Sequence, residues 1–458
     1  MSKRNPYKKE QSCEGINIVT TAYTLKDAMS IKETQNTKVP DFDTGRVKQL
    51  LPGYHCWDSD LAFDTDGNIA DIDGYNVLWA LCRPEGAGFS SSNKIAYFYT
   101  KDGVHYTFGG FLFETAIYDG ISEWSGSLRY RDDGKLQMFY TVADGYEAYG
   151  NWQTRQRFAV SIHPVSTDET TLKIEAPIHH ELLHGASEPD GIIYETPDQA
   201  AKREALNPTR HLVLAGSDQT ENNCDRDSFV YRNKRDGQDY VVFEGNTGPG
   251  AGYAPGIVRD DYLGRGMALE GVAITEDMLK ANGCVGIIKL TNEDGTFGVR
   301  KKPWLVTNLV TDEIERITVF DYDGHVYLFV DCHGNKMTTN ASNPDMVNRD
   351  FMLGFRAPYF GGPLTPLNGN GVVLQQKSGG AAYAGQNENQ QYLYSFGINP
   401  TAEAKESGIF KCVTYAGWSN AADGSGLKQI MSSGPSLFIK INGLCTEIVD
   451  MKHDILPA

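Results

Sequence analysis

Three acidic motifs that lie far apart in the chain place carboxylates beside groups suited to hold a sugar. They are Trp57-Asp58, Arg226-Asp227 and the run DEIER at 312–316. Cleavage of a glycosidic bond through an oxocarbenium-like transition state needs one ionised carboxylate as nucleophile and a second, protonated carboxyl as acid. Acids on separate strands can converge at the axis of a β-propeller. The motifs therefore indicate sugar cleavage.

The DEIER run supplies two candidates for the protonated carboxyl. In an extended strand residues i and i+2 face the same side, so we expect Glu313 and Glu315 to point together while Ile314 faces away. Two neighbouring carboxylates resist joint ionisation, which raises the pKa of one and suits it to general acid work near neutral pH. The alternative is a solvated strand edge on which Arg316 pairs with one glutamate.

Aromatic side chains accompany the acids. Trp57 precedes Asp58, and the run EWSGS (123–127) places a second tryptophan beside two serine hydroxyls. An indole face can stack on a sugar ring, although core packing is the commoner role of an isolated tryptophan. Arg226-Asp227 can equally be a structural ion pair. Each motif alone leaves a structural role open.

The elements that must position these motifs are short β-strands. Apolar runs rich in β-branched and aromatic residues are typical of strands. They occur at 75–82, 94–100, 136–141, 211–216, 240–246, 317–330 and 436–441. Asp-Gly steps such as Asp323-Gly324 favour tight hairpins beside several of them. The sequence predicts an all-β fold of antiparallel hairpins, for which a propeller, a β-helix and stacked sandwiches remain open.

No linker rich in proline or serine divides the 458 residues. We therefore expect an N-terminal extension over residues 1–40 and one domain over residues 41–458. The basic start of the chain has no apolar segment behind it, so no signal peptide is predicted. This favours a cytoplasmic protein or non-classical export, with an extracellular location as the alternative.

The formal net charge of −17 and the pI near 5.0 oppose binding to nucleic acid or to an anionic membrane. No run reaches the roughly 18 to 20 apolar residues needed to cross a bilayer. The eight cysteines form no CxxC pair, so a structural zinc site is not expected. A neutral partner fits this composition, and no cofactor is indicated.

Six ordered blocks resemble the motifs of glycoside hydrolase family 68, which contains the levansucrases, the inulosucrases and certain β-fructofuranosidases. The blocks are CWDSD (56–60), EWSGS (123–127), RDS (226–228), VVFEGNTG (241–248), TDEIER (311–316) and YLFVDCHGNK (327–336). The resemblance implies a five-bladed β-propeller with a sucrose pocket at its axis. It also implies sucrose and fructan or oligosaccharide acceptors as partners.

The resemblance assigns roles to the three acids. Asp58 matches the nucleophile that attacks the anomeric carbon of the fructosyl unit and forms a covalent intermediate. Glu315 matches the acid that protonates the departing glucosyl oxygen and then deprotonates the acceptor. Asp227 matches the transition-state stabiliser that binds hydroxyls of the fructosyl ring. Such a double displacement retains the anomeric configuration.

Several matched positions are expected to bind substrate. Trp57 and Trp124 resemble walls of the pocket, and Ser125 resembles the residue that hydrogen-bonds the nucleophile. Arg316 is expected among the binding residues, and Asn222 stands where the family often has an acceptor-side residue.

Four further positions match the glucosyl side of the pocket. Arg226, Glu313 and His333 would face the glucosyl unit, and Glu244 resembles a supporting acid behind Arg226. Position 333 is arginine in many Gram-positive members and histidine in many Gram-negative ones. Histidine there favours shorter products.

The chain departs from the family pattern at a metal site and at a proline. Asp312 matches a calcium-binding aspartate of some members, but Ala254 stands where a glutamine ligand is expected and Glu221 replaces another aspartate. Too few oxygens remain for a site with 6 to 8 ligands, so no metal is expected. Ser228 replaces a proline after Asp227, which leaves that backbone less constrained.

The expected activity is sucrose cleavage with transfer to water or to sugars, giving short fructooligosaccharides. A polymer-forming levansucrase or inulosucrase is the alternative within the family. A related invertase of family 32 or an arabinanase-like member of family 43 is the rival enzyme, but the WMNDPNG-like block of such invertases is replaced here by WDSD at 57–60. A sugar-binding propeller without activity is the non-enzyme alternative, and the retention of all three acids argues against it.

Overall fold

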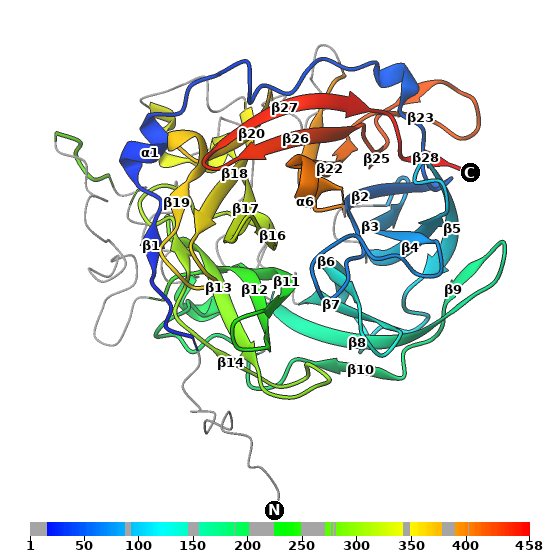
Figure 1. Ribbon diagram of the computed structural model, residues 1–458, viewed down its shortest axis with the longest axis horizontal. Helices are drawn as coiled ribbons and strands as arrows, with labels where there is room; N and C mark the ends of the chain where they lie inside the picture. The colour runs from blue at the N-terminus through cyan, green and yellow to red at the C-terminus, as the bar shows by residue number, and fades with distance from the viewer. Residues whose placement is uncertain are drawn as a thin grey trace, which may run out of the picture.

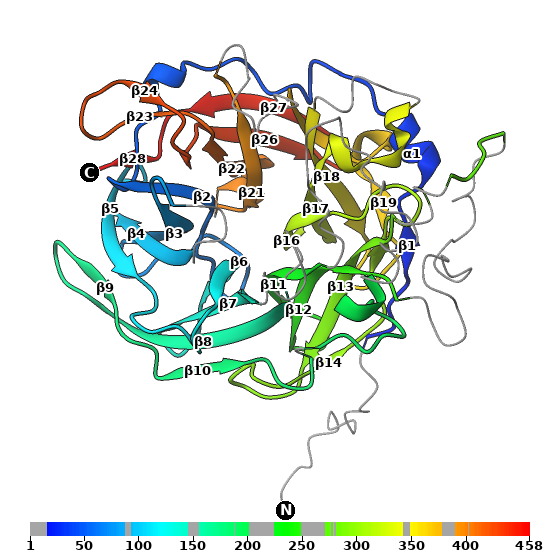
Figure 2. The same ribbon diagram turned by 180° about the vertical axis from the view of Figure 1, so that it is seen from behind.

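The computed structural model describes residues 16–458 apart from a set of short stretches. These are 88–92, 145–154, 187, 201–223, 249–270, 276–277, 279–280, 342–348, 378–389 and 402. The described strands form five large sheets around one central axis (Figure 1, Figure 2). The predicted all-β, five-bladed β-propeller is therefore confirmed.

The blades follow one another along the chain. Blade I pairs β2 (Tyr54–Leu61), β3 (Asn76–Pro84), β4 (Lys94–Thr100) and β5 (His105–Phe111). Blade II pairs β6 (Ser122–Tyr130), β7 (Lys135–Asp144), β8 (Arg155–Thr167) and β10 (His179–Leu182), with β9 (Leu172–Ile174) also on β8. Blade III pairs β11 (Asp225–Asn233), β12 (Gln238–Asn246), β13 (Gly283–Leu290) and β15 (Leu305–Val306), with β14 (Gly298–Arg300) also on β13.

The last two blades have the same plan. Blade IV pairs β16 (Glu315–Tyr322), β17 (His325–His333), β18 (Arg349–Ala357) and β19 (Thr365–Pro366), with β20 (Val372–Lys377) also on β18. Blade V pairs β21 (Leu393–Asn399), β22 (Ile409–Ala416), β26 (Ser436–Asn442) and β27 (Cys445–Lys452), with β25 (Ser432–Ser433) also on β22. In every blade the first strand is the innermost one (Figure 2).

The other described elements are short. They are α1 (Leu25–Met29), η1 (Thr44–Arg46), η2 (Gly334–Lys336), η3 (Thr338–Ala341), η5 (Leu367–Gly369), α6 (Ala404–Ser407) and the ribbon of β23 (Ser419–Asn420) and β24 (Leu427–Lys428). Among the described residues, no helix has the length and apolar character to span a bilayer.

Segments near the two ends of the chain extend the sheets. β1 (Thr21–Ala22) pairs in parallel with β15 of blade III, and β28 (Leu456–Pro457) pairs in parallel with β5 of blade I. Between blades I and V, the backbone N–H of Cys56 donates to the carbonyl of Met431 at 2.8 Å. Hydrogen bonding across this seam helps to close the ring.

Strand formation follows the apolar runs of the sequence. Six of the seven predicted runs lie in strands, and the run at 211–216 lies outside the described residues. Asp323 and Gly324 both have positive φ, 47° and 70°, and join β16 to β17 in the predicted tight hairpin. β17 is buried from Val326 to His333, because a propeller blade is covered by a neighbour on each face and both sides of its strands are buried.

Each innermost strand carries a β-bulge near its beginning. The pairing register shifts directly after Trp57 in β2, Trp124 in β6, Arg226 in β11, Glu315 in β16 and Tyr394 in β21. Four of these bulges hold a non-glycine residue with left-handed backbone: Asp58 (φ 46°), Asp227 (φ 53°), Arg316 (φ 51°) and Ser395 (φ 56°). This conformation costs about 1–2 kcal/mol per residue, and a bulge re-aims the side chain it contains. The fold thus keeps strained backbone where the motifs meet the axis.

Candidate active site

Asp58 lies in the bulge of β2 and is partly exposed. The hydroxyl of Ser125, from the bulge of β6, donates to its Oδ2 at 2.7 Å. This hydrogen bond fixes the orientation of the carboxyl group. The two neighbouring blades therefore present one oriented carboxylate at the axis.

Glu315 begins β16 and is held from two other blades. Arg226 Nη2 donates to its Oε1 at 2.9 Å, and the Tyr394 hydroxyl donates to its Oε2 at 2.7 Å. Arg226 also donates from Nε to Glu244 Oε2 at 2.8 Å. The carboxyl of Glu315 is thus fixed by an arginine of blade III and a tyrosine of blade V.

Asp227 occupies the bulge of β11 and is buried. Its Oδ2 accepts from the backbone N–H of Arg316 at 2.9 Å, and its own N–H donates to Thr141 Oγ1 at 3.2 Å. Carboxylate oxygens of Asp227, Glu244 and Glu315 lie within 4.8 Å of one another. The fold thus brings Asp227 and Glu315 together, and Asp58 is close enough to raise the pKa of Asp227.

Burial raises the pKa of three carboxyls in this cluster. Burial, followed by the charge of Glu313, raises the pKa of Glu315 to about 8, against the lowering effects of Arg226 and His333. Burial also raises the pKa of Glu244 far above its usual range, and it raises the pKa of Asp227. Near pH 7 Glu315 therefore carries a proton that it can donate.

His333 is a buried cation beside Glu315. Its Nδ1 lies 2.8 Å from Asp350 Oδ1, and its Nε2 lies 3.8 Å from Glu315 Oε2. The imidazole stacks on Tyr394 with 4.1 Å between ring centroids. Burial alone would lower the pKa of His333, but Asp350 and Glu313 raise it to about 10. His333 therefore stays positively charged at neutral pH.

Glu313 does not share a strand face with Glu315. β16 begins at Glu315, and Glu313 lies before it, buried, with its Oε2 3.2 Å from Lys336 Nζ and 4.0 Å from Arg226 Nη2. The predicted convergence nonetheless holds, because an oxygen of Glu313, an oxygen of Glu315 and a ring nitrogen of His333 lie within 4.8 Å of one another. Strand alternation is not the cause, because the strand starts two residues after Glu313. The charge of Glu313 nonetheless raises the pKa of Glu315, as expected.

Arg316 does not pair with a glutamate on a solvated edge. Its side chain is buried, donates from Nη2 to the carbonyl of Ser59 at 3.1 Å and lies 3.8 Å from Asp60 Oδ2. The alternative reading of the DEIER run as a solvated strand edge is therefore wrong.

The two tryptophans border the cluster and remain partly exposed. The Arg83 guanidinium lies over Trp57, 5.2 Å from the ring centroid, and Arg226 lies over Trp124 at 5.9 Å. Trp57, Asp58, Trp124 and Glu315 are partly exposed, whereas Arg226, Asp227, Glu244, Glu313, Arg316 and His333 are buried. The partly exposed groups are thus those a ligand reaches first. Asn222 lies outside the described residues.

Sequence reasoning missed two side chains of this cluster. Tyr394 comes from blade V, which none of the six blocks includes, and Asp350 lies beyond the last block. The one available signal for Tyr394 was the run YLYSFG at 392–397, which begins an innermost strand like the other motifs. Nothing in the sequence marks Asp350.

Two sets of metal-capable side chains occur among the described residues. They are Glu313, Glu315 and His333, and Asp227, Glu244 and Glu315. Both share Glu315 and lie against the Arg226 guanidinium, which already neutralises part of their charge. Asp312 belongs to neither set. These donors therefore fit proton transfer and sugar binding better than a resident cation.

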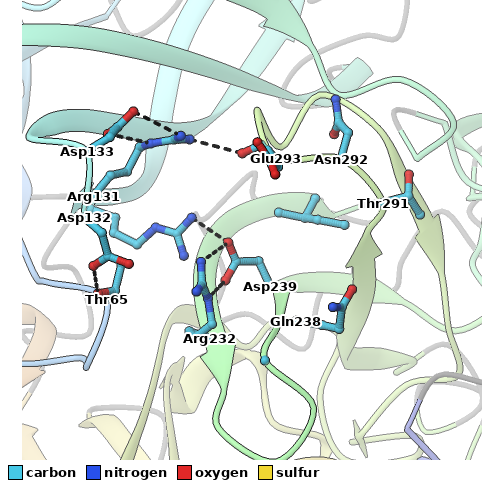
Figure 3. Close-up of a pocket in the computed structure, with 13 residues that line it drawn as sticks. Thr65, Arg131, Asp132, Asp133, Arg232, Gln238, Asp239, Thr291, Asn292 and Glu293 are labelled. Atoms are coloured by element: carbon cyan, nitrogen blue, oxygen red, sulfur yellow. Dashed lines mark hydrogen bonds and ion pairs between the residues drawn. The ribbon is translucent and has the colours of Figure 1, made fainter. Parts of the chain in front are cut away.

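A pocket lies at the other end of the innermost strands, between blades II and III (Figure 3). This far-end pocket, of about 390 Å³, is lined by Thr65, Arg129, Arg131, Asp132, Asp133, Arg232, Gly237, Gln238, Asp239, Leu290, Thr291, Asn292 and Glu293. No residue of the six sequence motifs lines this pocket, and its Asp133 and Asp239 pair with its arginines. It is distinct from the axial cluster.

A five-bladed propeller that gathers a fixed carboxylate, a protonated carboxyl and two tryptophans at its axis has the site of a glycoside-cleaving enzyme. The chain belongs to the Levansucrase/Invertase family, glycoside hydrolase family 68, whose family model matches residues 14–413. The family suggested by the sequence motifs is therefore confirmed.

Relatives resemble the chain over nearly its whole length. It is 30% identical to a levansucrase of Bacillus amyloliquefaciens, over 99% of this chain and 92% of that protein. It is 28% identical to a protein of Geobacillus stearothermophilus named inactive levansucrase, over 98% of this chain and 90% of that one. Family membership alone therefore does not guarantee activity, and the axial side chains must be considered in their own right.

Solved structures share the fold. A levansucrase complexed with sucrose is 26% identical, with a TM-score of 0.77 and coverage of 97% of this chain and 98% of that chain. The Bacillus subtilis levansucrase, at 24% identity and the same TM-score, supports the fold alone.

Proposed function

We propose that the protein is a retaining sucrose fructosyltransferase and β-fructofuranosidase. The family, the similarity to a levansucrase complexed with sucrose and the axial carboxyls support this function. The observation that carries it is the contrast between Asp58, oriented by Ser125, and Glu315, whose pKa is raised to about 8. A double displacement needs an oriented carboxylate nucleophile and a protonated acid.

In the first step Asp58 attacks the anomeric carbon of the fructosyl unit while the bond to the glucosyl oxygen breaks. Glu315 gives its proton to that oxygen, so glucose leaves and a fructosyl ester remains on Asp58. The positive charge of His333, 3.8 Å from Glu315, favours the carboxylate that Glu315 becomes. Asp227 stabilises the developing positive charge on the fructosyl ring through its hydroxyls.

In the second step Glu315, now ionised, removes a proton from water or from a sugar hydroxyl. The activated oxygen attacks the anomeric carbon, the ester bond to Asp58 breaks, and Glu315 is protonated again for the next cycle. Water gives free fructose, whereas a sugar acceptor gives a longer fructoside. Hydrogen bonds from Arg226 and Tyr394 keep the Glu315 carboxyl in place in both steps.

We further propose that the products are short fructooligosaccharides. His333 supports this, since its ring is stacked on Tyr394 and tied to Asp350, which leaves it little reach toward an acceptor chain. A polymer-forming activity is the competing product pattern, and acceptor-side loops decide between them.

Incubation of the purified protein with sucrose tests the proposal. We expect free glucose, and at high sucrose less free fructose than glucose, with the difference present as oligosaccharides in chromatography. Asp58→Asn is the matched control, because an amide cannot attack. Binding of sucrose without release of glucose would identify an inactive sugar-binding propeller instead.

A further inference from the structure

Arg316 lies inside the wall of the axial site rather than on its surface. Its side chain is 6% exposed as a residue, and its guanidinium lies over the indole of Trp79, 5.2 Å from the ring centroid. Nη2 donates to the carbonyl of Ser59, the residue that follows Asp58, at 3.1 Å. The side chain therefore binds the β2 bulge from which Asp58 projects.

The backbone of Arg316 holds a second acid. Arg316 is within the bulge of β16, so its N–H is released from the ladder with β17 and donates instead to Asp227 Oδ2 at 2.9 Å. This geometry depends on the left-handed φ of 51°, which a branched side chain would not tolerate. Arg316 thus contacts the strand of Asp58 and the carboxylate of Asp227, and it directly follows Glu315.

Arg316 is also the cation of an acidic chamber. Four buried or partly buried aspartates act on it: Asp58, Asp60, Asp227 and Asp331. Two of them are further fixed, because Asn399 donates to Asp60 Oδ1 at 2.6 Å and the N–H of Phe396 donates to Asp331 Oδ2 at 2.6 Å. Burial alone would lower the pKa of Arg316, but the four carboxylates raise it.

We infer that Arg316 is a positioning residue and not a ligand of the sugar. It holds the nucleophile Asp58 and the stabilising acid Asp227 at their working distance and supplies the buried positive charge beside them. This role rests on the proposed function. It differs from the substrate-binding role that the sequence suggested for Arg316, because the guanidinium points to β2 and Trp79 rather than to the partly exposed groups of the site.

Three variants test this role: Arg316→Gln, Arg316→Lys and, as the matched control, Arg129→Gln. Arg129 is equally buried and pairs with Asp239 at 2.8 Å, but it lies at the far end of β6. A displacement of about 1 Å at a reacting group costs roughly 100-fold in rate. We therefore expect Arg316→Gln to lower kcat about 100-fold or more with KM within about 3-fold, and Arg129→Gln to leave kcat within about 2-fold.

The pH profile separates positioning from sugar binding. The charge of Arg316 lowers the pKa of Asp227, so without this cation the acidic limb of kcat/KM should move to higher pH in Arg316→Gln. Arg316→Lys keeps the charge but loses the planar fork, so its kcat should fall while its acidic limb stays in place. A raised KM with unchanged kcat and pH profile in Arg316→Gln would show that Arg316 binds the sugar, and wild-type kinetics in both variants would show that it has no role.

The contact between Arg316 and Asp60 can be tested even if the proposed function fails. If the wild-type protein does not cleave sucrose, the proposed function fails. The coupling of Arg316 to Asp60 can still be measured by thermal unfolding of Arg316→Gln, Asp60→Asn and the double variant. We expect the double variant to unfold at a higher temperature than Arg316→Gln, because Asp60 is then no longer an unpaired buried charge. Additive shifts would overturn the pairing, and Arg316→Lys provides the kinetic test if Arg316→Gln does not fold.

Discussion

The two ends of β6 and β11 carry polar clusters of opposite character. At the axis, one arginine is shared by several acids: Arg226 contacts Glu244 at 2.8 Å and Glu315 at 2.9 Å. In the far-end pocket one acid is shared by two arginines, since Asp239 pairs with Arg129 and also with Arg232, which Figure 3 labels. The same two strands thus have acids sharing one arginine at the axial end and arginines sharing one acid at the far end.

The consequence is visible in protonation. At the axis burial raises the pKa of Glu315 to about 8, and that of Glu244 far above its usual range. In the far-end pocket burial also acts to raise the pKa of Asp239, but hydrogen bonds from Arg129 and Arg232 lower it overall. Carboxyls that hold a proton near pH 7 mark a site for proton transfer, whereas satisfied ion pairs mark a structural seam. A hollow and a concentration of charge do not by themselves identify the active site.

The largest effect is expected at Asp58. Asp58→Asn keeps the size of the side chain and can still accept from Ser125, but the amide cannot form the ester, so kcat should fall by roughly 10,000-fold or more. Glucose release from sucrose measures this, and circular dichroism checks the fold. Turnover within about 10-fold of the wild type would remove Asp58 from its role as nucleophile.

Glu315→Gln should slow sucrose cleavage by about 100- to 10,000-fold, because the leaving glucosyl oxygen then receives no proton. A fructoside with a good leaving group needs little protonation, so its cleavage should be slowed far less. Comparison of the two substrates in one variant measures the difference. Equal slowing of both would contradict the general acid assignment.

The effect of Glu313 on Glu315 can be measured in the alkaline limb of the pH profile of kcat/KM. Glu315 donates its proton while protonated, so kcat/KM should fall as pH rises through about 8, whereas His333 keeps its charge up to about 10. Glu313→Gln removes a negative charge that raises the pKa of Glu315, so the midpoint should move to lower pH. A midpoint that stays in place or rises in Glu313→Gln would show that Glu313 does not set the proton affinity of Glu315.

The far-end pocket should respond in stability and not in activity. Asp239→Asn leaves Arg129 without its charged partner, and we expect a loss of about 1–3 kcal/mol in the free energy of unfolding, with kcat within about 2-fold. Asp239 has a lowered pKa, so its contribution is present above the unfolded pKa near 3.8 and is lost as pH falls below it.

The difference between Asp239→Asn and the wild type should therefore shrink in acid, as measured by urea unfolding at neutral and acidic pH. Asp133→Asn is the matched control, because the Asp133 side chain is 41% exposed and its pairs with Arg131 and Lys135 contribute at most about 1 kcal/mol. A kcat loss in Asp239→Asn comparable to that of Glu315→Gln would erase the distinction between the two ends.

The described residues show which structural features can be predicted from the local sequence pattern. The strand of 94–100 and the hairpin at Asp323-Gly324 form as predicted, because β-branched and aromatic runs and a turn with positive φ are local preferences. At Glu313 the predicted convergence with Glu315 is found, but alternation was the wrong reason, since the strand begins only at Glu315. Local pattern also could not foresee left-handed backbone at Asp58, since a bulge arises from pairing between two strands.

The sequence by itself determined the acids, the two tryptophans, the strand content and the family. Only the tertiary structure decided which groups surround those acids. Tyr394 binds Glu315, the N–H of Arg316 binds Asp227, Asp350 holds the neighbouring His333, and the side chain of Arg316 binds the Ser59 carbonyl beside Asp58. The physical reason is that a proton's affinity for a carboxyl depends on burial and on charges within a few ångströms. In a propeller those neighbours come from different blades, so they are near in space while remote in the chain.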